Sequence, residues 1–224
     1  MRSRRWMTGI VATGVAAIGM VLLGPLFLLR QTRCCTDTQA LSNARQIGLA
    51  LYDFGSDYGK FPDASTMAVV EESSGTTWNL KDRTSNDLFK QLFAVGIVTS
   101  EEIFYARING SKKPDNVISP ESKILEPREC GFAYIPGGSS KSDPSRPLVV
   151  TPLIPGTLKF DPVPFGGKAV VLLANNSAKA LKIQPDGRVL MPDGKDLFDP
   201  TQPYWGGVTP EVKWADLAAP SSPR

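Results

Sequence analysis

The pattern of apolar and polar positions opens with an uninterrupted apolar segment, Met7 to Leu29, which contains no charged side chain. A helix of that length is roughly 34 Å long, enough to cross the hydrocarbon core of a bilayer. Arginines flank the segment on both sides, at Arg2, Arg4 and Arg5 and again at Arg30 and Arg33. We therefore predict a transmembrane helix over 7–29 that follows a short cytoplasmic N-terminus, residues 1–6.

Two other interpretations of this segment stay open. It can be a cleaved secretory signal, although the apolar run exceeds the usual length and no small-x-small cleavage site follows it. It can also be a twin-arginine export signal, because Ser3, Arg4 and Arg5 begin such a motif. An uncleaved anchor fits the length best. It predicts a single-pass protein of the inner membrane whose C-terminal domain faces the periplasm.

From residue 36 onward the apolar positions take a helical period, which predicts an amphipathic helix over 36–58. Thr36 or Asp37 can cap its start, and Gly59 and Pro62 follow its end. One face carries the apolar side chains Ala40, Ala44, Ile47, Leu51 and Phe54. We expect this face to form a surface for lateral packing with similar helices.

The chain from 59 to 214 predicts an α+β domain. Short helices are expected at 63–73 and at 85–95, the second with Ser85 as its N-cap, and a helical turn follows over 100–107. Residues 108–130 are polar and proline-bearing, which indicates a loop. Apolar runs bounded by turn residues then predict an antiparallel β meander, with strands at 131–135, 147–154, 168–174, 178–184 and 188–191. Residues 215–224 are expected to be a frayed tail.

Charge and composition narrow the function classes. The chain has 25 basic and 22 acidic residues, but five of the basic ones and none of the acidic ones lie in residues 1–35. The domain itself is slightly acidic and has no basic run with interleaved aromatic residues, so we expect no nucleic-acid partner. Histidine is absent, which removes the commonest general base and metal ligand. No phosphate-binding loop is present either, and we expect the protein not to be an enzyme.

The three cysteines are Cys34, Cys35 and Cys130. If the domain is extracytoplasmic, one of the first two can form a disulfide with Cys130. Buried or free thiols are the alternative. Without a CxxC pair or a histidine, the cysteines do not indicate a metal site.

The segments Leu41–Phe54 and Asp57–Pro62 resemble the start of the soluble domain in type II secretion pseudopilins and related pilin-like proteins of planctomycete or verrucomicrobial type. That family has the pattern LxNxKQIGLAL, then Y, D and GxFP, directly after an N-terminal membrane helix. The segments Ala169–Leu173 and Asp196–Pro200, the turn at 185–187 and the run 204–206 resemble its C-terminal half more loosely.

The resemblance implies a pilin-like α+β fold, in which a long N-terminal helix, half membrane anchor and half amphipathic, packs on an antiparallel β meander. It also implies a structural or interaction protein whose partners are the membrane and other pilin-like or secretion-system subunits. Family members usually carry a processing signal with a glutamate five residues after the cut. Here Gly14 stands where that glutamate would follow Gly9, so the chain can be an anchored relative that does not polymerise.

Some pseudopilins hold calcium in a C-terminal loop, and this chain has Asp193, Asp196 and Asp199 around Gly194. Oxygen-rich loops suit calcium, although the order of residues does not match a full calcium loop. A turn with solvated carboxylates is the simpler interpretation, and no other cofactor is expected. The aromatic residues Trp78, Tyr204, Trp205 and Trp214 can line a binding surface or pack into the core. The alternative function is therefore an anchored periplasmic module that binds a ligand or calcium.

Overall fold

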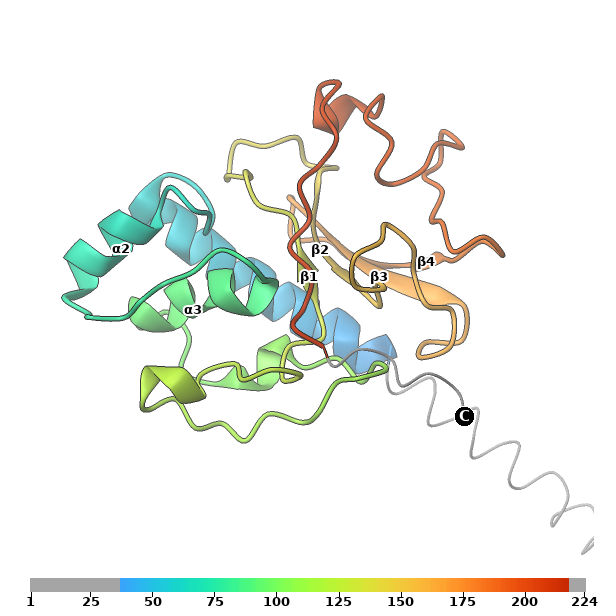
Figure 1. Cartoon of the computed structure of the whole chain (residues 1–224). Coiled ribbons are helices and arrows are strands. Elements are labelled where there is room, and N and C mark those ends of the chain that lie inside the picture. Colours follow the sequence, from blue (N-terminus) through green and yellow to red (C-terminus); the bar gives the residue numbers. More distant parts are fainter. Residues whose placement is uncertain (1–36, 218–224) are drawn as a thin grey trace, which may run out of the picture. The chain divides into compact units, whose positions relative to one another are not determined.

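A computed structural model of the chain describes residues 37–217 (Figure 1). The predicted transmembrane helix at 7–29, Cys34 and Cys35, and residues 218–224 of the predicted tail lie outside the described residues. Within the described range, no helix combines the length and the apolar character that crossing a membrane requires.

The described residues form an α+β domain with three α-helices. The first covers residues 37–58 and is drawn in blue to cyan in Figure 1; α2, Met67–Ser74, and α3, Ser85–Ala94, follow it. The predicted helices are thus confirmed with small shifts at their ends. The predicted turn over 100–107 is shorter, since only η1, Glu101–Phe104, is helical there. Two further 3₁₀ turns are η2, Glu121–Lys123, and η3, Pro203–Trp205.

The sheet has four strands in the order β1-β2-β3-β4, and each pairs antiparallel with the next. The strands are β1, Ala133–Tyr134, β2, Pro147–Thr151, β3, Lys168–Leu173, and β4, Ala178–Lys182. The predicted meander is confirmed for these four. The expected fifth strand at 188–191 is wrong: this segment makes only isolated bridges, Ile183 with Val189 and Leu190 with Asp196. The turns at 185–187 and 192–194 leave too few residues between them for a ladder.

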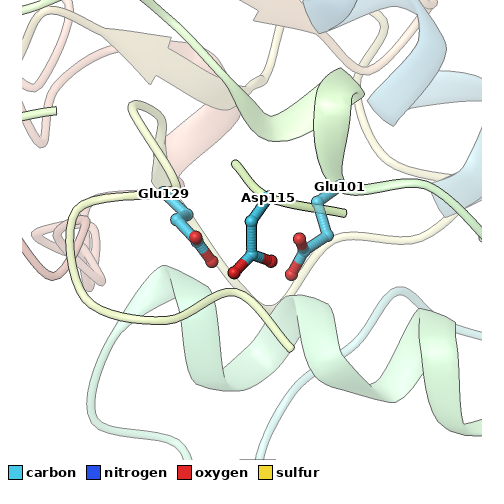
Figure 2. A group of neighbouring side chains, drawn as sticks. All are labelled: Glu101, Asp115 and Glu129. Atoms are coloured by element: carbon cyan, nitrogen blue, oxygen red, sulfur yellow. The ribbon is translucent and has the colours of Figure 1, made fainter. Parts of the chain in front are cut away.

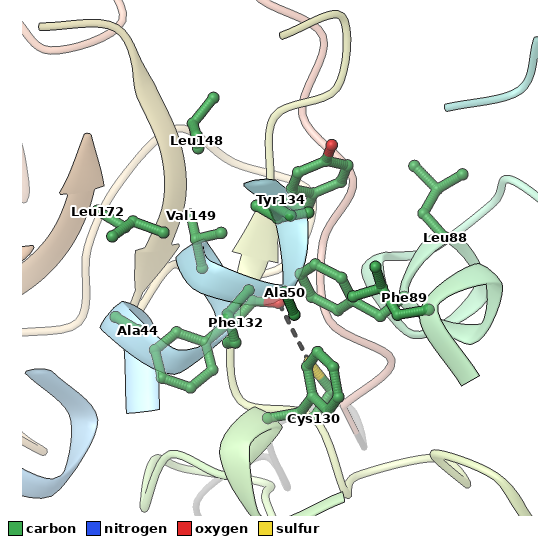
Figure 3. Close-up of a cluster of buried hydrophobic side chains, with 14 of the residues drawn as sticks. Ala44, Ala50, Leu88, Phe89, Cys130, Phe132, Tyr134, Leu148, Val149 and Leu172 are labelled. Atoms are coloured by element: carbon green, nitrogen blue, oxygen red, sulfur yellow. Dashed lines mark hydrogen bonds between the residues drawn. The ribbon is translucent and has the colours of Figure 1, made fainter. Parts of the chain in front are cut away.

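The sheet separates two apolar clusters because side chains alternate between its faces. Val170 and Leu172 of β3 join the helix-side core, which also contains Ala44, Leu51, Leu88, Phe89 and Phe132 (Figure 3). Ala169, Val171 and Leu173 join the C-terminal core, which also contains Val150, Phe160, Ile183, Leu197 and Trp205. The same strand therefore supports both clusters.

Specific contacts fix the 37–58 helix along β3. Asp37 Oδ2 lies 2.9 Å from Lys168 Nζ at the start of both elements. Farther along, a Cβ on Gly48 would lie 3.2 Å from Leu172, and the Tyr52 hydroxyl donates to the Ala174 carbonyl. Since these contacts occur in the same order along both segments, the helix and β3 run in the same direction.

The apolar face of this helix is not available to another molecule. Ala40, Ala44, Ile47, Leu51 and Phe54 are at most 1% exposed, and all five belong to the helix-side core. The expectation that this face packs laterally against other helices is therefore corrected: it packs against the domain's own sheet and α3. The helical period identifies an apolar stripe, but it does not distinguish an internal partner from an external one.

Candidate functional site

Three carboxylates from separate parts of the 101–129 region meet at one place. Glu101, Asp115 and Glu129 each bring a carboxylate oxygen within 4.8 Å of the other two. Figure 2 shows the carboxylate of Asp115 between those of Glu101 and Glu129. Glu101 and Glu129 are fully buried, whereas Asp115 is exposed. Among the described residues, this is the group of acidic side chains whose spacing suits a metal ion.

Glu101 holds two distant points of the irregular loop. It lies at the start of η1, and its side chain accepts hydrogen bonds from the backbone N–H groups of Leu125 at 2.5 Å and Asn116 at 2.9 Å. Both donors have positive φ, 44° at Leu125 and 64° at Asn116. These conformations are unfavourable for most L-residues, so the buried carboxylate helps to maintain them.

The two carboxylate oxygens of Glu129 differ in their hydrogen bonding. Its Oε2 accepts a 2.7 Å hydrogen bond from the Glu126 N–H. Its Oε1 is buried and accepts no hydrogen bond, although Lys112 Nζ lies 3.2 Å away. That ammonium group donates instead to Glu126 Oε2 at 3.1 Å, and Glu126 also pairs with Lys123 at 2.8 Å.

Burial and the close approach of these charged groups shift the pKa values of Glu101 and Lys112. Burial raises the pKa of Glu101, and the charges of Glu129 and Asp115 act in the same direction, whereas the N–H groups of Leu125 and Asn116 oppose the shift. The pKa of Lys112 is raised by the carboxylates of Glu126 and Glu129. The cluster thus carries more negative charge than its lysine neighbour balances.

The carboxylates predicted to bind calcium do not converge in this way. Asp193, Asp196 and Asp199 accept hydrogen bonds from backbone N–H groups two residues ahead, those of Lys195, Phe198 and Thr201. Asp193 accepts a further bond from Gln202 Nε2 at 3.1 Å. Such contacts are typical of Asx turns. Within residues 37–217 the three aspartates do not form a group with metal-ligand spacing, which favours the simpler interpretation of a turn.

Cys130 is a free, buried thiol. Its Sγ donates to the Phe132 carbonyl at 3.4 Å and lies 3.7 Å from Ser85 Oγ (Figure 3). Burial raises its pKa to about 11, so the thiolate that starts disulfide exchange is scarce at neutral pH. Its predicted disulfide partners, Cys34 and Cys35, lie outside the described residues, so the disulfide stays a prediction.

The aromatic residues pack into the domain. Tyr204 and Trp205 are less than 10% exposed, and both donate to the Leu197 carbonyl. The guanidinium of Arg146 lies 4.9 Å from the centre of the Trp205 ring. Trp78 packs against the helix-side core and Trp214 against the C-terminal core, both partly buried. These contacts favour a packing role over an aromatic binding surface.

The outer face of the 37–58 helix is polar with one large apolar exception. Leu49 is 57% exposed, and the exposed residues Arg45 and Asp53 lie one helical turn before and after it. Residues four apart share a helix face, so the three form one stripe.

Comparison of the chain with protein-family models, with curated proteins and with solved structures found no match. The acidic cluster was also missed by sequence reasoning. Its members stand fourteen positions apart in a segment that the pattern assigned to a helical turn and a loop. Neither spacing nor periodicity relates such residues, because the irregular backbone between them brings them together.

Proposed function

We propose that this chain is a membrane-anchored structural or interaction protein of the pilin-like kind. In this proposal the 7–29 segment holds the α+β domain at the outer surface of the inner membrane. The partners are other pilin-like or secretion-system subunits, and the role is not catalytic. The absence of histidine and the resemblance over residues 41–62 support this class.

The observation that carries the proposal is the stripe Arg45, Leu49 and Asp53. A lone exposed leucine is ordinary on a protein surface, but this one lies between opposite charges. Two parallel helices in register would place Arg45 against Arg45. An offset of eight residues, roughly 12 Å, places Arg45 against Asp53 of the next copy and Leu41 against its Leu49. Such an offset contact is head-to-tail and can be repeated from copy to copy.

The test is chemical cross-linking of the full chain in native membranes. The wild type should give species larger than a monomer, and Leu49→Lys should reduce their yield by about 10-fold, because it replaces an apolar contact with a charge. Val69→Lys is the matched control, since Val69 on α2 is 53% exposed and lies outside the stripe. A strictly monomeric wild type would contradict the proposal, as would recovery of a freely soluble protein that lacks the first 30 or so residues.

The alternative, a periplasmic module that binds a ligand or calcium through its C-terminal loops, has less support. Tyr204 and Trp205 are buried there, and the carboxylates of Asp193, Asp196 and Asp199 accept local hydrogen bonds.

A further inference from the structure

We propose that Glu101, Asp115 and Glu129 form a binding site for a hard divalent cation, with calcium the best match. This site is distinct from the C-terminal aspartates, and it does not depend on the function proposed above.

The spacing of the ligand atoms suits one ion. Calcium binds oxygen at 2.3–2.6 Å, so two oxygens on the same ion stand no more than about 5 Å apart. The three carboxylate oxygens lie within 4.8 Å of one another. The hydrogen bonds that Glu101 accepts do not prevent coordination, because each carboxylate oxygen has two lone pairs.

A second observation points to a ligand. The carboxylate of Glu129 points toward Asp115 (Figure 2), and its Oε1 is buried and accepts no hydrogen bond. A buried carboxylate oxygen without a directed donor is costly; the ion pair with Lys112 offsets part of that cost, and a directly coordinated divalent cation would offset more. The ammonium of Lys112 at 3.2 Å supplies charge without a directed bond.

Lys112 can move away from Glu129 when an ion binds and still keep its hydrogen bond to Glu126. Its side chain is 39% exposed, and it already donates to Glu126 Oε2. Asp115 lies on the exposed side of the cluster, so an ion from solvent has a route to the two buried carboxylates. Water would complete the coordination on that side.

The chemistry of the ligands selects the class of cation. A set made of carboxylate oxygens favours calcium, magnesium or manganese over zinc or copper. Calcium tolerates irregular geometry, whereas magnesium requires a nearly ideal octahedron. Three carboxylates fixed by separate loop segments are better suited to the more tolerant ion.

The test is calcium titration of the purified, chelator-treated full chain in a mild detergent, followed by calorimetry and thermal unfolding. At a calcium concentration 100-fold above the dissociation constant, the midpoint of unfolding should rise by about 5–10 °C. Asp115→Asn should weaken binding by about 10-fold or more, because it removes a charged ligand. Asparagine keeps the oxygen that accepts the Val117 N–H, so the loop turn is retained.

Two further variants separate the site from a purely structural cluster. Lys112→Met should strengthen calcium binding by about 3–10-fold, since it removes a competing positive charge, whereas Lys113→Met should not. A double variant, Asp193→Asn with Asp199→Asn, should bind calcium like the wild type. The proposal is overturned if the wild type binds no calcium at 10 mM, or if sodium chloride of equal ionic strength gives the same shift. Unchanged affinity in Asp115→Asn would also overturn it.

Discussion

Buried polar side chains supply hydrogen bonds to several irregular backbone segments of this domain. Asn43 donates to the carbonyls of Glu102 and Tyr105, at 2.9 and 2.8 Å, and so ties η1 to the first helix. Asn86 on α3 donates to the carbonyls at 125 and 126, and Glu101 accepts from the N–H groups at 116 and 125, so both hold the segment 116–126. Buried backbone groups need such partners, so each of these residues stabilises backbone groups that lack a partner in a regular helix or strand ladder.

Asn86→Ala should lower the free energy of unfolding by about 2–4 kcal/mol. Asn86 is 3% exposed; it donates to the Leu125 and Glu126 carbonyls and accepts from the Asp216 N–H at 3.0 Å. The substitution leaves the Leu125 carbonyl and the Asp216 N–H without partners in the interior, whereas the Glu126 carbonyl keeps its bond from the Glu129 N–H at 3.1 Å. Urea unfolding of the full chain, followed by circular dichroism, measures the change. Asn109→Ala is the control, since Asn109 bonds Asp161 at the surface and should cost less than about 0.5 kcal/mol. Equal costs at both positions would contradict the assignment.

At the scale of elements, local sequence signals place the helices well but assign the cap of α3 one residue too late. Ser85 was the expected N-cap. The structure instead has Thr84 as N-cap in a reciprocal capping box with Asp87, while Ser85 is buried and donates to the Phe132 carbonyl at 2.6 Å. Two adjacent hydroxyl residues carry the same local signal, and only the packing of α3 against β1 decides which of them turns inward.

Thr84→Ala should destabilise the domain by about 1 kcal/mol, because it removes the acceptor for the Asp87 N–H at 3.2 Å. Thr84→Ser keeps the hydroxyl and should retain most of that stability. The two variants are compared by urea unfolding under identical conditions. A loss in Thr84→Ser as large as that in Thr84→Ala would show that the methyl group, rather than the cap, is what matters.

At the scale of the whole described domain, one strand supports both apolar clusters. Val170 packs in the helix-side core and its neighbour Val171 in the C-terminal core, and both are fully buried. Since β3 pairs with β2 on one side and β4 on the other, loss of either cluster weakens the sheet as a unit. The two clusters are therefore expected to unfold together.

Val170→Ala and Val171→Ala should each cost about 1–3 kcal/mol through lost burial and the cavity left behind. Each should shift the same single transition. Tryptophan fluorescence in a Trp6→Phe, Trp78→Phe background follows Trp205 and Trp214 of the C-terminal core, and far-ultraviolet circular dichroism follows the helices. Two separate transitions, each sensitive to only one of the variants, would contradict a shared core strand.

The sequence by itself determined the elements of this fold. The helical period over 36–58 and the apolar runs at 147–154 and 168–174 mark real elements, because amphipathic periods reflect which side chains leave water. Turn residues such as those at 175–177 and 185–187 were equally informative, because their backbone preferences act locally. The α+β class and the order of the four strands follow from these local signals.

Only the tertiary structure decided how the elements use their surfaces. It showed that the apolar face of the 37–58 helix is internal, that Cys130 is a buried free thiol, and that the converging carboxylates are Glu101, Asp115 and Glu129 rather than the C-terminal aspartates. The physical reason is the same in each case. Contacts between residues far apart in the chain depend on how elements pack, and a pattern that repeats every two or four residues carries no information about that packing.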